Sequence, residues 1–142
     1  RAVALVDFPV IANGEIWSPE DSQRARSASH CEDLMLGRGV LCRPDLPKLV
    51  RAATDGVDAR GLSWLDIAEL LQGFEQQKRQ ECAERHAAGP VKQWLGYLRH
   101  YYPQAAALFA DVKRLTDPEA VCAVIRAHTP SRNGEHSTAV AA

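Results

Sequence analysis

Two short runs containing glycine have residue types that could hold a phosphate group. Residues 13–15 (Asn-Gly-Glu) follow one apolar stretch, and residues 37–39 (Gly-Arg-Gly) follow the next. Glycine lets the backbone turn with positive φ and approach a ligand closely, and exposed backbone N–H groups beside a cation bind phosphate. Either run alone also fits an ordinary glycine turn. Because both end consecutive predicted strands of one βαβ unit, together they favour a phosphate site.

A second candidate surface combines cations with a glycine on one helical face. Lys92, Gly96 and Arg99 recur at i, i+4 and i+7, which brings them near one another in a helix. A glycine between two cations could let a nucleic-acid backbone come close. Tyr97 lies off the apolar stripe and could stack or form a hydrogen bond. The same pattern is equally typical of a solvated basic face in which Gly96 serves helix packing, so both interpretations stay open.

The remaining reactive residue types do not have the spacing of a catalytic centre. The five histidines are scattered, and no nucleophile lies beside a base. The four cysteines form no C-x-x-C pair and have no histidine at zinc-finger spacing. We therefore expect reduced thiols, with Cys42 as a small buried residue. We expect neither a metal site nor a catalytic residue in this chain.

Length and composition limit the class of protein. The chain has 142 residues, a formal net charge of -1, 46% hydrophobic residues and 25% charged residues, which is ordinary for a globular protein. It lacks an apolar run long enough to span a membrane, and we expect a cytoplasmic monomer. Between Arg85 and Arg114 cations exceed acids, which would attract phosphates. A complete (β/α)₈ barrel needs at least roughly 200 residues, so one cannot form here.

The elements that would position these residues fall into two parts. After the predicted end of a helix at 1–7, apolar stretches at 9–12 and 33–36 predict buried parallel strands. Helices are expected at 18–28 and 46–53. Together they give a strand–helix–strand–helix order, and both strands end in a loop that contains glycine. Ligands bind at that end in βα architectures.

Beyond residue 53 the hydrophobic pattern becomes helical. Residues 54–61 are polar and predict a linker. Helices are then expected from Ser63, from Val91 to Tyr102, from Pro103 and from Asp117, which suggests a four-helix bundle over 62–128. The small polar residues at 129–142 predict a disordered tail.

Three runs of the chain, at 9–17, 33–39 and 92–99, resemble the bacterial tRNA-dihydrouridine synthases in sequence and order. The third run looks like the C subfamily, which acts on uridine 16 of the tRNA D-loop. The resemblance covers nearly the whole chain except the tail. It implies an α/β plus all-α fold, with the last two βα units of an FMN-binding TIM (β/α)₈ barrel at 1–53 and a helical tRNA-binding domain at 62–128.

The resemblance also implies which residues bind the cofactor and the tRNA. The FMN phosphate and the nearby ribityl oxygens would be held by Asn13, Gly14, Glu15, Gly37 and Arg38. Lys92, Tyr97 and Lys113 match positions that contact tRNA in the C subfamily, and Arg99 is added from its position on the helix. Pro90 departs from the family pattern, because a basic residue is expected there.

By the same resemblance, the parent reaction uses NADPH to reduce FMN. A hydride then passes to the C5–C6 double bond of a uracil ring, with a cysteine as general acid. That cysteine and a lysine that contacts the flavin belong to a first half with no counterpart here, and the chain does not begin with Met. We interpret the chain as a C-terminal fragment or truncated gene product and expect it to be inactive alone.

Two alternatives compete with this interpretation. One is a free-standing helical RNA-binding module with residues 1–53 as a vestigial scaffold. The other is a different FMN barrel with an unrelated helical extension, and the 92–99 run argues against it. Two βα units cannot close a barrel, and they leave open strand edges and apolar faces. We therefore expect residues 1–53 to be poorly folded in isolation and about 60–128 to fold alone.

Overall fold

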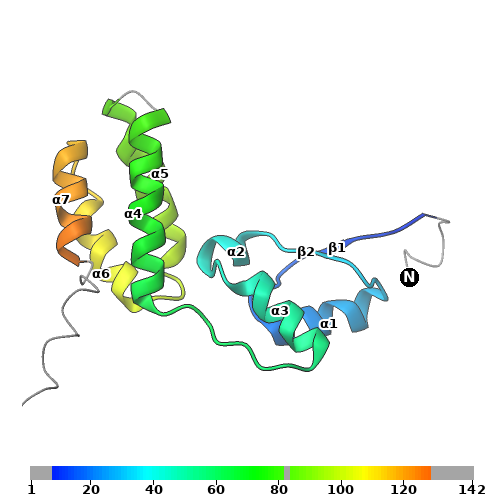
Figure 1. Cartoon of the computed structure of the whole chain (residues 1–142). Helices are drawn as coiled ribbons and strands as arrows, with labels where there is room; N and C mark the ends of the chain where they lie inside the picture. Colours follow the sequence, from blue (N-terminus) through cyan, green and yellow to red (C-terminus); the bar gives the residue numbers. More distant parts are fainter. Residues whose placement is uncertain (1–7, 82–83, 129–142) are drawn as a thin grey trace, which may run out of the picture.

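The computed structural model describes residues 8–81 and 84–128, without the side chains of 84–86. The predicted helix end at 1–7 and the predicted tail at 129–142 lie outside the described residues. Figure 1 shows the chain order, with a βα part followed by a helical part. The elements are β1 (Ala12–Asn13), α1 (Pro19–Ser29), β2 (Leu34–Met35), α2 (Arg38–Cys42), α3 (Leu46–Asp55), α4 (Trp64–Glu81), α5 (Glu84–Leu98), α6 (Pro103–Val112) and α7 (Pro118–His128).

The two strands pair in parallel, as expected for a βαβ unit. Ala12 lies opposite Leu34, and Asn13 lies opposite Met35. The expectation that both strands are buried is wrong, because Asn13 and Met35 are exposed. In Figure 1, α1 and α3 lie together on one side of the strands, and no described element covers the other side. The paired ends nevertheless place residues 13–15 and 37–39 at the same edge of the sheet.

In the described residues α1, α4 and α7 begin at a capping side chain, and the sequence predicts the caps at Ser18 and Ser63. Ser18 Oγ accepts from the Asp21 amide at 3.1 Å at the start of α1. Ser63 Oγ accepts from the Asp66 amide at 3.3 Å, while an Asp66 carboxylate oxygen accepts from the Ser63 amide at 2.8 Å. Asp117 accepts from an amide of α7 at 2.8 Å. These side chains satisfy backbone donors that a helix start leaves unpaired.

The helical part is built around α5, which packs against α4, α6 and α7. Each of these helices contributes fully buried aliphatic side chains to one core, and burial of each such side chain stabilises the fold by about 1.5–3 kcal/mol. The largest are Ile67, Leu71, Val91, Leu95, Leu98, Leu108, Val112, Val121 and Ile125. The predicted helical period of this region is therefore confirmed.

The bounds of the central helix differ from the prediction. α5 begins at Glu84 and contains Pro90 inside it, whereas the prediction started the helix at Val91. It also ends at Leu98, short of the predicted Tyr102. Proline usually opens or breaks a helix, so the residues before Pro90 were not assigned to this helix. The apolar stripe predicted for this helix included Tyr101, but in the turn after α5 Tyr101 is exposed, and the buried residue there is Tyr102.

Three smaller expectations also need correction. Residues 37–39 were expected as a loop, but Gly37 is the N-cap of the short helix α2, and the next two residues begin it. α3 continues to Asp55 and ends at Gly56, whose φ of 67° suits only glycine without strain, so the linker starts later than residue 54. The pattern of the helix from Pro103 predicted Ala106 as an apolar position, but in α6 the buried alanine is Ala105, and Ala106 is exposed.

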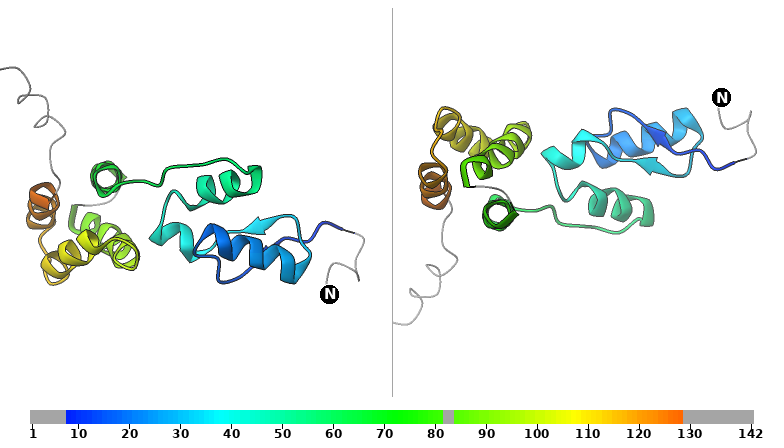
Figure 2. Two further views of the ribbon diagram at one scale, coloured as in Figure 1. Left: turned by 90° about the horizontal axis from the view of Figure 1, so that it is seen from below. Right: turned by 90° about the horizontal axis from the view of Figure 1, so that it is seen from above.

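The two parts meet where α2 packs against α5. The indole Nε1 of Trp94 on α5 donates to the carbonyl oxygen of Leu41 on α2 at 3.1 Å. The views in Figure 2 show α2 as the element of the βα part that lies nearest the helices. Within residues 8–81 and 84–128, no helix is long and apolar enough to cross a membrane.

Candidate functional site

The five residues predicted to hold a phosphate line a single hollow of about 330 Å³. They are Asn13, Gly14, Glu15, Gly37 and Arg38, and they are joined there by Ile16, Trp17 and Gly39. One group follows β1 and the other follows β2. The parallel pairing of these strands, with Asn13 opposite Met35, brings together two runs from separate segments of the chain.

Close backbone packing explains the glycines of this hollow. A Cβ at Gly39 would lie 2.2 Å from the Ile16 carbonyl oxygen and 3.0 Å from Leu46 Cδ2, so no larger residue fits without a shift. Gly14 has a φ of 144°, which side chains rarely allow. The sequence analysis treated Gly39 only as a glycine that exposes a backbone N–H group. Its role is to let the start of α2 pack against the loop after β1.

The charged groups at the hollow are paired with each other. Arg38 Nη2 lies 3.2 Å from Glu15 Oε1, and both side chains are largely exposed. The Trp17 indole Nε1 donates to Glu15 Oε2 at 2.9 Å, and the Arg38 guanidinium lies 5.5 Å from the centre of the Trp17 ring. Sequence reasoning did not identify Trp17 as a site residue. An exposed ion pair of this kind contributes little stability, so an incoming phosphate can take over Arg38 at small cost.

Three of the four predicted tRNA-binding residues lie along the line where α5 meets α6. Lys92 Nζ donates to the Leu115 carbonyl oxygen at 2.6 Å, which holds its ammonium group against the loop after α6. Lys113 begins that loop and is exposed, as is Arg114. We call Lys92, Arg99, Lys113 and Arg114 the basic seam.

Arg99 joins the basic seam through an aromatic ring of α6. Its guanidinium lies 4.6 Å from the centre of the Phe109 ring, and its Nε donates to the Gly96 carbonyl oxygen at 3.2 Å. The Lys113 amide donates to the Phe109 carbonyl oxygen at 2.9 Å, one helical turn along. A Cβ at Gly96 would lie 3.8 Å from Phe109 Cε2, which is an ordinary contact. Gly96 thus faces α6, as the helix-packing interpretation expects. The space beside it would nevertheless admit an alanine side chain.

Tyr97 lies apart from the basic seam. It lines an apolar hollow of about 500 Å³ between α2, α4 and α5. The other lining residues are Val40, Leu41, Pro44, Phe74, Pro90, Gln93 and Trp94. The rings of Phe74 and Trp94 meet edge to face with centres 5.2 Å apart. Tyr97 is half-buried beside these rings. The structure thus gathers Lys92, Arg99 and Lys113 but does not bring Tyr97 to them.

Comparison with known proteins decides the family. A match to the family described as "Dihydrouridine synthase (Dus)" covers residues 2–130 of the chain. The chain belongs to the dihydrouridine synthase family. The family-level resemblance stated from the three sequence runs is therefore confirmed.

Curated relatives of this dihydrouridine synthase chain carry a more specific name. A tRNA-dihydrouridine(16) synthase of Pseudomonas putida is 45% identical over 117 residues, 82% of this chain and 36% of the relative. One of Aquipseudomonas alcaligenes is 43% identical over 121 residues, 85% of this chain and 38% of the relative. One of Ralstonia nicotianae is 37% identical over 139 residues, which are 96% of this chain and 41% of the relative. The chain thus spans little more than a third of the first two relatives.

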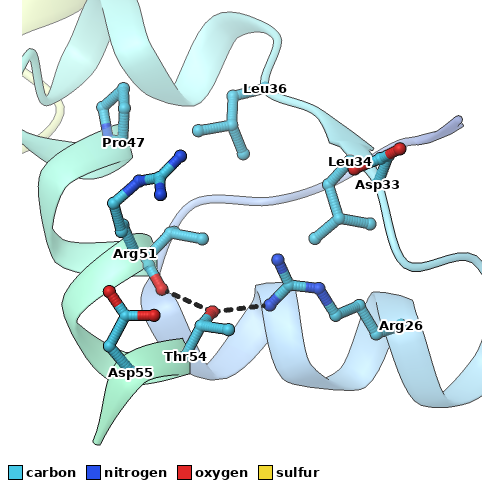
Figure 3. A pocket seen from close by; sticks show the side chains of 9 residues that line it. Arg26, Asp33, Leu34, Leu36, Pro47, Arg51, Thr54 and Asp55 are labelled. Carbon is cyan, nitrogen blue, oxygen red and sulfur yellow. Dashed lines mark hydrogen bonds between the residues drawn. The ribbon is translucent and has the colours of Figure 1, made fainter.

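A further hollow of about 280 Å³ in this family member lies between α1, β2 and α3 (Figure 3). Arg26 of α1 reaches across it, and its Nη1 donates to Thr54 Oγ1 at 2.8 Å. Thr54 Oγ1 in turn donates to the Val50 carbonyl oxygen at 2.9 Å. No predicted site residue lines this hollow. Its polar contacts join α1 to α3, which gives it a structural explanation.

The cysteines of the described chain are structural. Cys31, Cys42 and Cys122 are free and buried, whereas Cys82 lies outside the described residues. Burial raises the pKa of the Cys42 thiol, so it stays protonated at neutral pH. Among residues 8–81 and 84–128, no three His, Cys, Asp or Glu side chains gather as they would around a metal ion.

Proposed function

We propose that this chain supplies part of the FMN phosphate site and the tRNA-binding helices of a tRNA-dihydrouridine synthase. The reaction would reduce uridine, at position 16 of the D-loop, to 5,6-dihydrouridine with NADPH as reductant. The observation that carries the proposal is the hollow in which residues 13–15 and 37–39 meet. The relatives, which are named for action on tRNA, support the choice of substrate.

The fold supports a matching division of the chain. We assign the residues up to Asp55, where α3 ends, to the last two βα units of a TIM (β/α)₈ barrel, 56–61 to a linker and 62–128 to a four-helix bundle. Within the described residues β1 and β2 pair only with each other, which leaves both outer strand edges open. Such edges are expected of two strands that belong to a larger sheet. The exposed Phe8, Ile11 and Met35 are the side chains that such neighbours would cover.

The hollow fits the phosphate of FMN. Residues 37–39 line the hollow at the start of α2, where the first backbone N–H groups of a helix have no partner within it, and Arg38 adds a fixed charge at the same edge. FMN, when bound, would supply the hydride chemistry. Glu15, held by Trp17, would orient Arg38 and accept from a hydroxyl group of the ribityl chain.

The basic seam would hold the tRNA backbone. Lys92, Arg99 and Lys113 come from different segments and present cations along one line, which suits consecutive phosphates. Tyr97, half-buried in the apolar hollow, would contact the tRNA at a different point from the seam. No residue of the described chain acts as the general acid in this proposal, so we expect the chain alone to bind but not to reduce.

A free-standing RNA-binding module is the second candidate function. One observation favours it. The buried core of the helical part draws all its members from Ile67 to Ile125, without a side chain of the βα part. Such a part can fold and bind RNA whether or not a barrel accompanies it.

An FMN titration followed by NMR tests the cofactor half of the proposal. We expect the amide resonances of residues 37–39 and 13–15 to shift together as FMN or inorganic phosphate is added. Arg38→Glu should abolish these shifts, and Arg51→Glu, the same charge change on α3, should leave them intact. Shifts that avoid both runs, or that survive Arg38→Glu, would remove the phosphate site.

A further inference from the structure

A buried ion pair lies at the junction of the two parts, outside both candidate sites. Arg43 and Asp45 sit between α2 and α3, with Arg43 Nε 3.3 Å from Asp45 Oδ1. The side chain of Asp45 is 3% exposed and that of Arg43 is 17% exposed. Burial of two charges costs solvation free energy, which their attraction offsets only in good geometry. A pair in such a place therefore needs an explanation other than stability.

The pair holds the segment that leads into α4. Asp45 Oδ2 accepts from the Leu62 amide at 2.9 Å, across 17 residues. A Cβ at Gly61 would lie 2.9 Å from Asp45 Oδ2 and 3.3 Å from Arg43 Nη2. The backbone at Gly61 thus passes directly against both charged groups, where a side chain would push them away.

The same pair reaches the turn between α5 and α6. The Arg43 guanidinium lies 4.6 Å from the centre of the Tyr101 ring, which packs 4.9 Å from the ring of Tyr102. Tyr102 is buried, and its pKa is raised to about 12, by burial first and by the charge of Asp45 second. In the described part of the chain, Arg43 Nε, Asp45 Oδ1 and Tyr102 Oη have no hydrogen-bond partner. Three buried polar atoms without a hydrogen bond thus belong to the Arg43–Asp45 pair and to Tyr102 beside it.

We propose that Arg43 and Asp45 form a clasp that fixes how the helical part is oriented relative to the βα part. The clasp touches the βα part, the segment before α4 and the α5–α6 turn at once. Besides it, α2 and α5 supply the packing between the parts, largely through exposed or half-buried side chains such as Leu41 and Trp94. A buried ion pair favours the arrangement in which its two charges stay together, whereas apolar contacts alone would allow several arrangements.

The clasp makes Asp45 a positioning residue for tRNA binding, a consequence that rests on the function proposed above. The phosphate hollow and the basic seam lie on different parts, and one tRNA would have to meet both. Two binding surfaces act together only if their geometry allows simultaneous contact, and freedom between them lowers the effective concentration of the second. Asp45 itself would not touch tRNA.

Two variants test the clasp by different routes. Asp45→Asn keeps the shape and an acceptor for the Leu62 amide but removes the charge that Arg43 faces. Gly61→Ala keeps both charges and places a methyl group too close to both side chains. Gly73→Ala on α4 is the matched control, because a Cβ there meets nothing within 4 Å.

The measurements are NMR residual dipolar couplings, amide exchange and tRNA affinity of the 142-residue chain. We expect wild type and Gly73→Ala to fit one alignment tensor for both parts. Asp45→Asn and Gly61→Ala should each need two alignment tensors, one for each part. In both variants the protection of the Leu62 amide should fall tenfold or more, while protection at Leu95 stays unchanged. Their tRNA affinity should be weaker by several fold. Unchanged protection at Leu95 shows that the variants are folded.

A single tensor and unchanged Leu62 protection in both variants would overturn the clasp. The two proposals fail in different ways. If the orientation changes as expected but the wild-type chain binds no tRNA, the clasp stands and the proposed function fails. If tRNA binds and the variants neither reorient nor bind more weakly, the function stands and the clasp fails.

Discussion

At the scale of single residues, Gly39 has the least room for a side chain among the glycines of the described residues. A methyl group there would overlap the Ile16 carbonyl oxygen, since its Cβ would lie at 2.2 Å. We expect Gly39→Ala to lower the free energy of unfolding by about 2–4 kcal/mol, because the backbone of α2 must move away from the loop. Gly73→Ala should raise it by up to about 1 kcal/mol, since alanine favours a helix interior. Urea denaturation of both variants gives the comparison, and equal effects would contradict it.

Gly96 allows a choice between the two interpretations of its role. Because a Cβ there makes only an ordinary contact with Phe109, Gly96→Ala should stabilise the chain by about 0.5–1 kcal/mol. If Gly96 serves helix packing alone, tRNA affinity should not change. We expect that result, with thermal denaturation and a binding titration as the measurements. A loss of affinity in a stabilised variant would show that the tRNA backbone approaches Gly96 itself.

The candidate residues could be predicted only where the local pattern carried the signal. The glycine runs at 13–15 and 37–39 follow apolar stretches, and that order alone places them at strand ends. The roles of Trp17 and of the pair formed by Arg43 and Asp45 depend in part on contacts with distant segments, since Trp17 faces Arg38 of the other glycine run. Asp45, for example, bonds a backbone group 17 residues away. Such contacts depend on packing that no short motif encodes.

At the scale of elements, a buried polar contact joins α4 to α7. The Cys122 thiol donates to Glu75 Oε1 at 2.6 Å, and Arg79 donates to the Cys122 sulfur at 3.4 Å while pairing with Glu119. Burial, then the hydrogen bond to Glu75 and its charge, raise the pKa of Cys122 from 9.0 to about 11. Arg79 opposes this shift only in part.

This shift predicts a loss of stability at alkaline pH. Between pH 9 and 11 the unfolded chain releases the Cys122 proton while the folded chain keeps it, so the unfolded state is favoured as pH rises. The slope should approach about 1.4 kcal/mol per pH unit, with no contribution below pH 9. Urea denaturation of wild type and Cys122→Ala across this range isolates the effect, because Tyr102 and Cys42 titrate in both. Parallel curves for the two proteins would refute it.

Local signals located most helix starts but not every element. Capping residues at Ser18, Ser63 and Asp117 act within one turn, so the sequence placed these helices correctly. The sequence did not predict α2, because Gly39 inside it is a poor helix former and is present for close packing. The start of α5 was also missed, because a proline such as Pro90 is unfavourable inside a helix. Here contacts with α4 and α7 stabilise the helix around it.

At the scale of the whole molecule, the two parts should differ in stability. The helical part has its own core, whereas the strands of the βα part are two residues each and covered on one side by described elements. We expect hydrogen exchange to show amide protection in α4–α7 that exceeds protection in residues 8–55 by a hundredfold or more. Comparable protection in both parts would mean that the chain unfolds as one cooperative unit.

The central claim is that the basic seam binds tRNA, and tRNA affinity measured against salt tests it most directly. For wild type we expect binding that weakens with a log–log slope of roughly -2 to -3, as for three phosphate contacts. Lys92→Glu and Lys113→Glu should each reduce affinity by at least about tenfold and make the slope shallower by roughly one unit. Lys48→Glu, an exposed charge reversal on α3, should leave both unchanged. Absent or salt-insensitive binding, or equal losses in all three variants, would contradict the account.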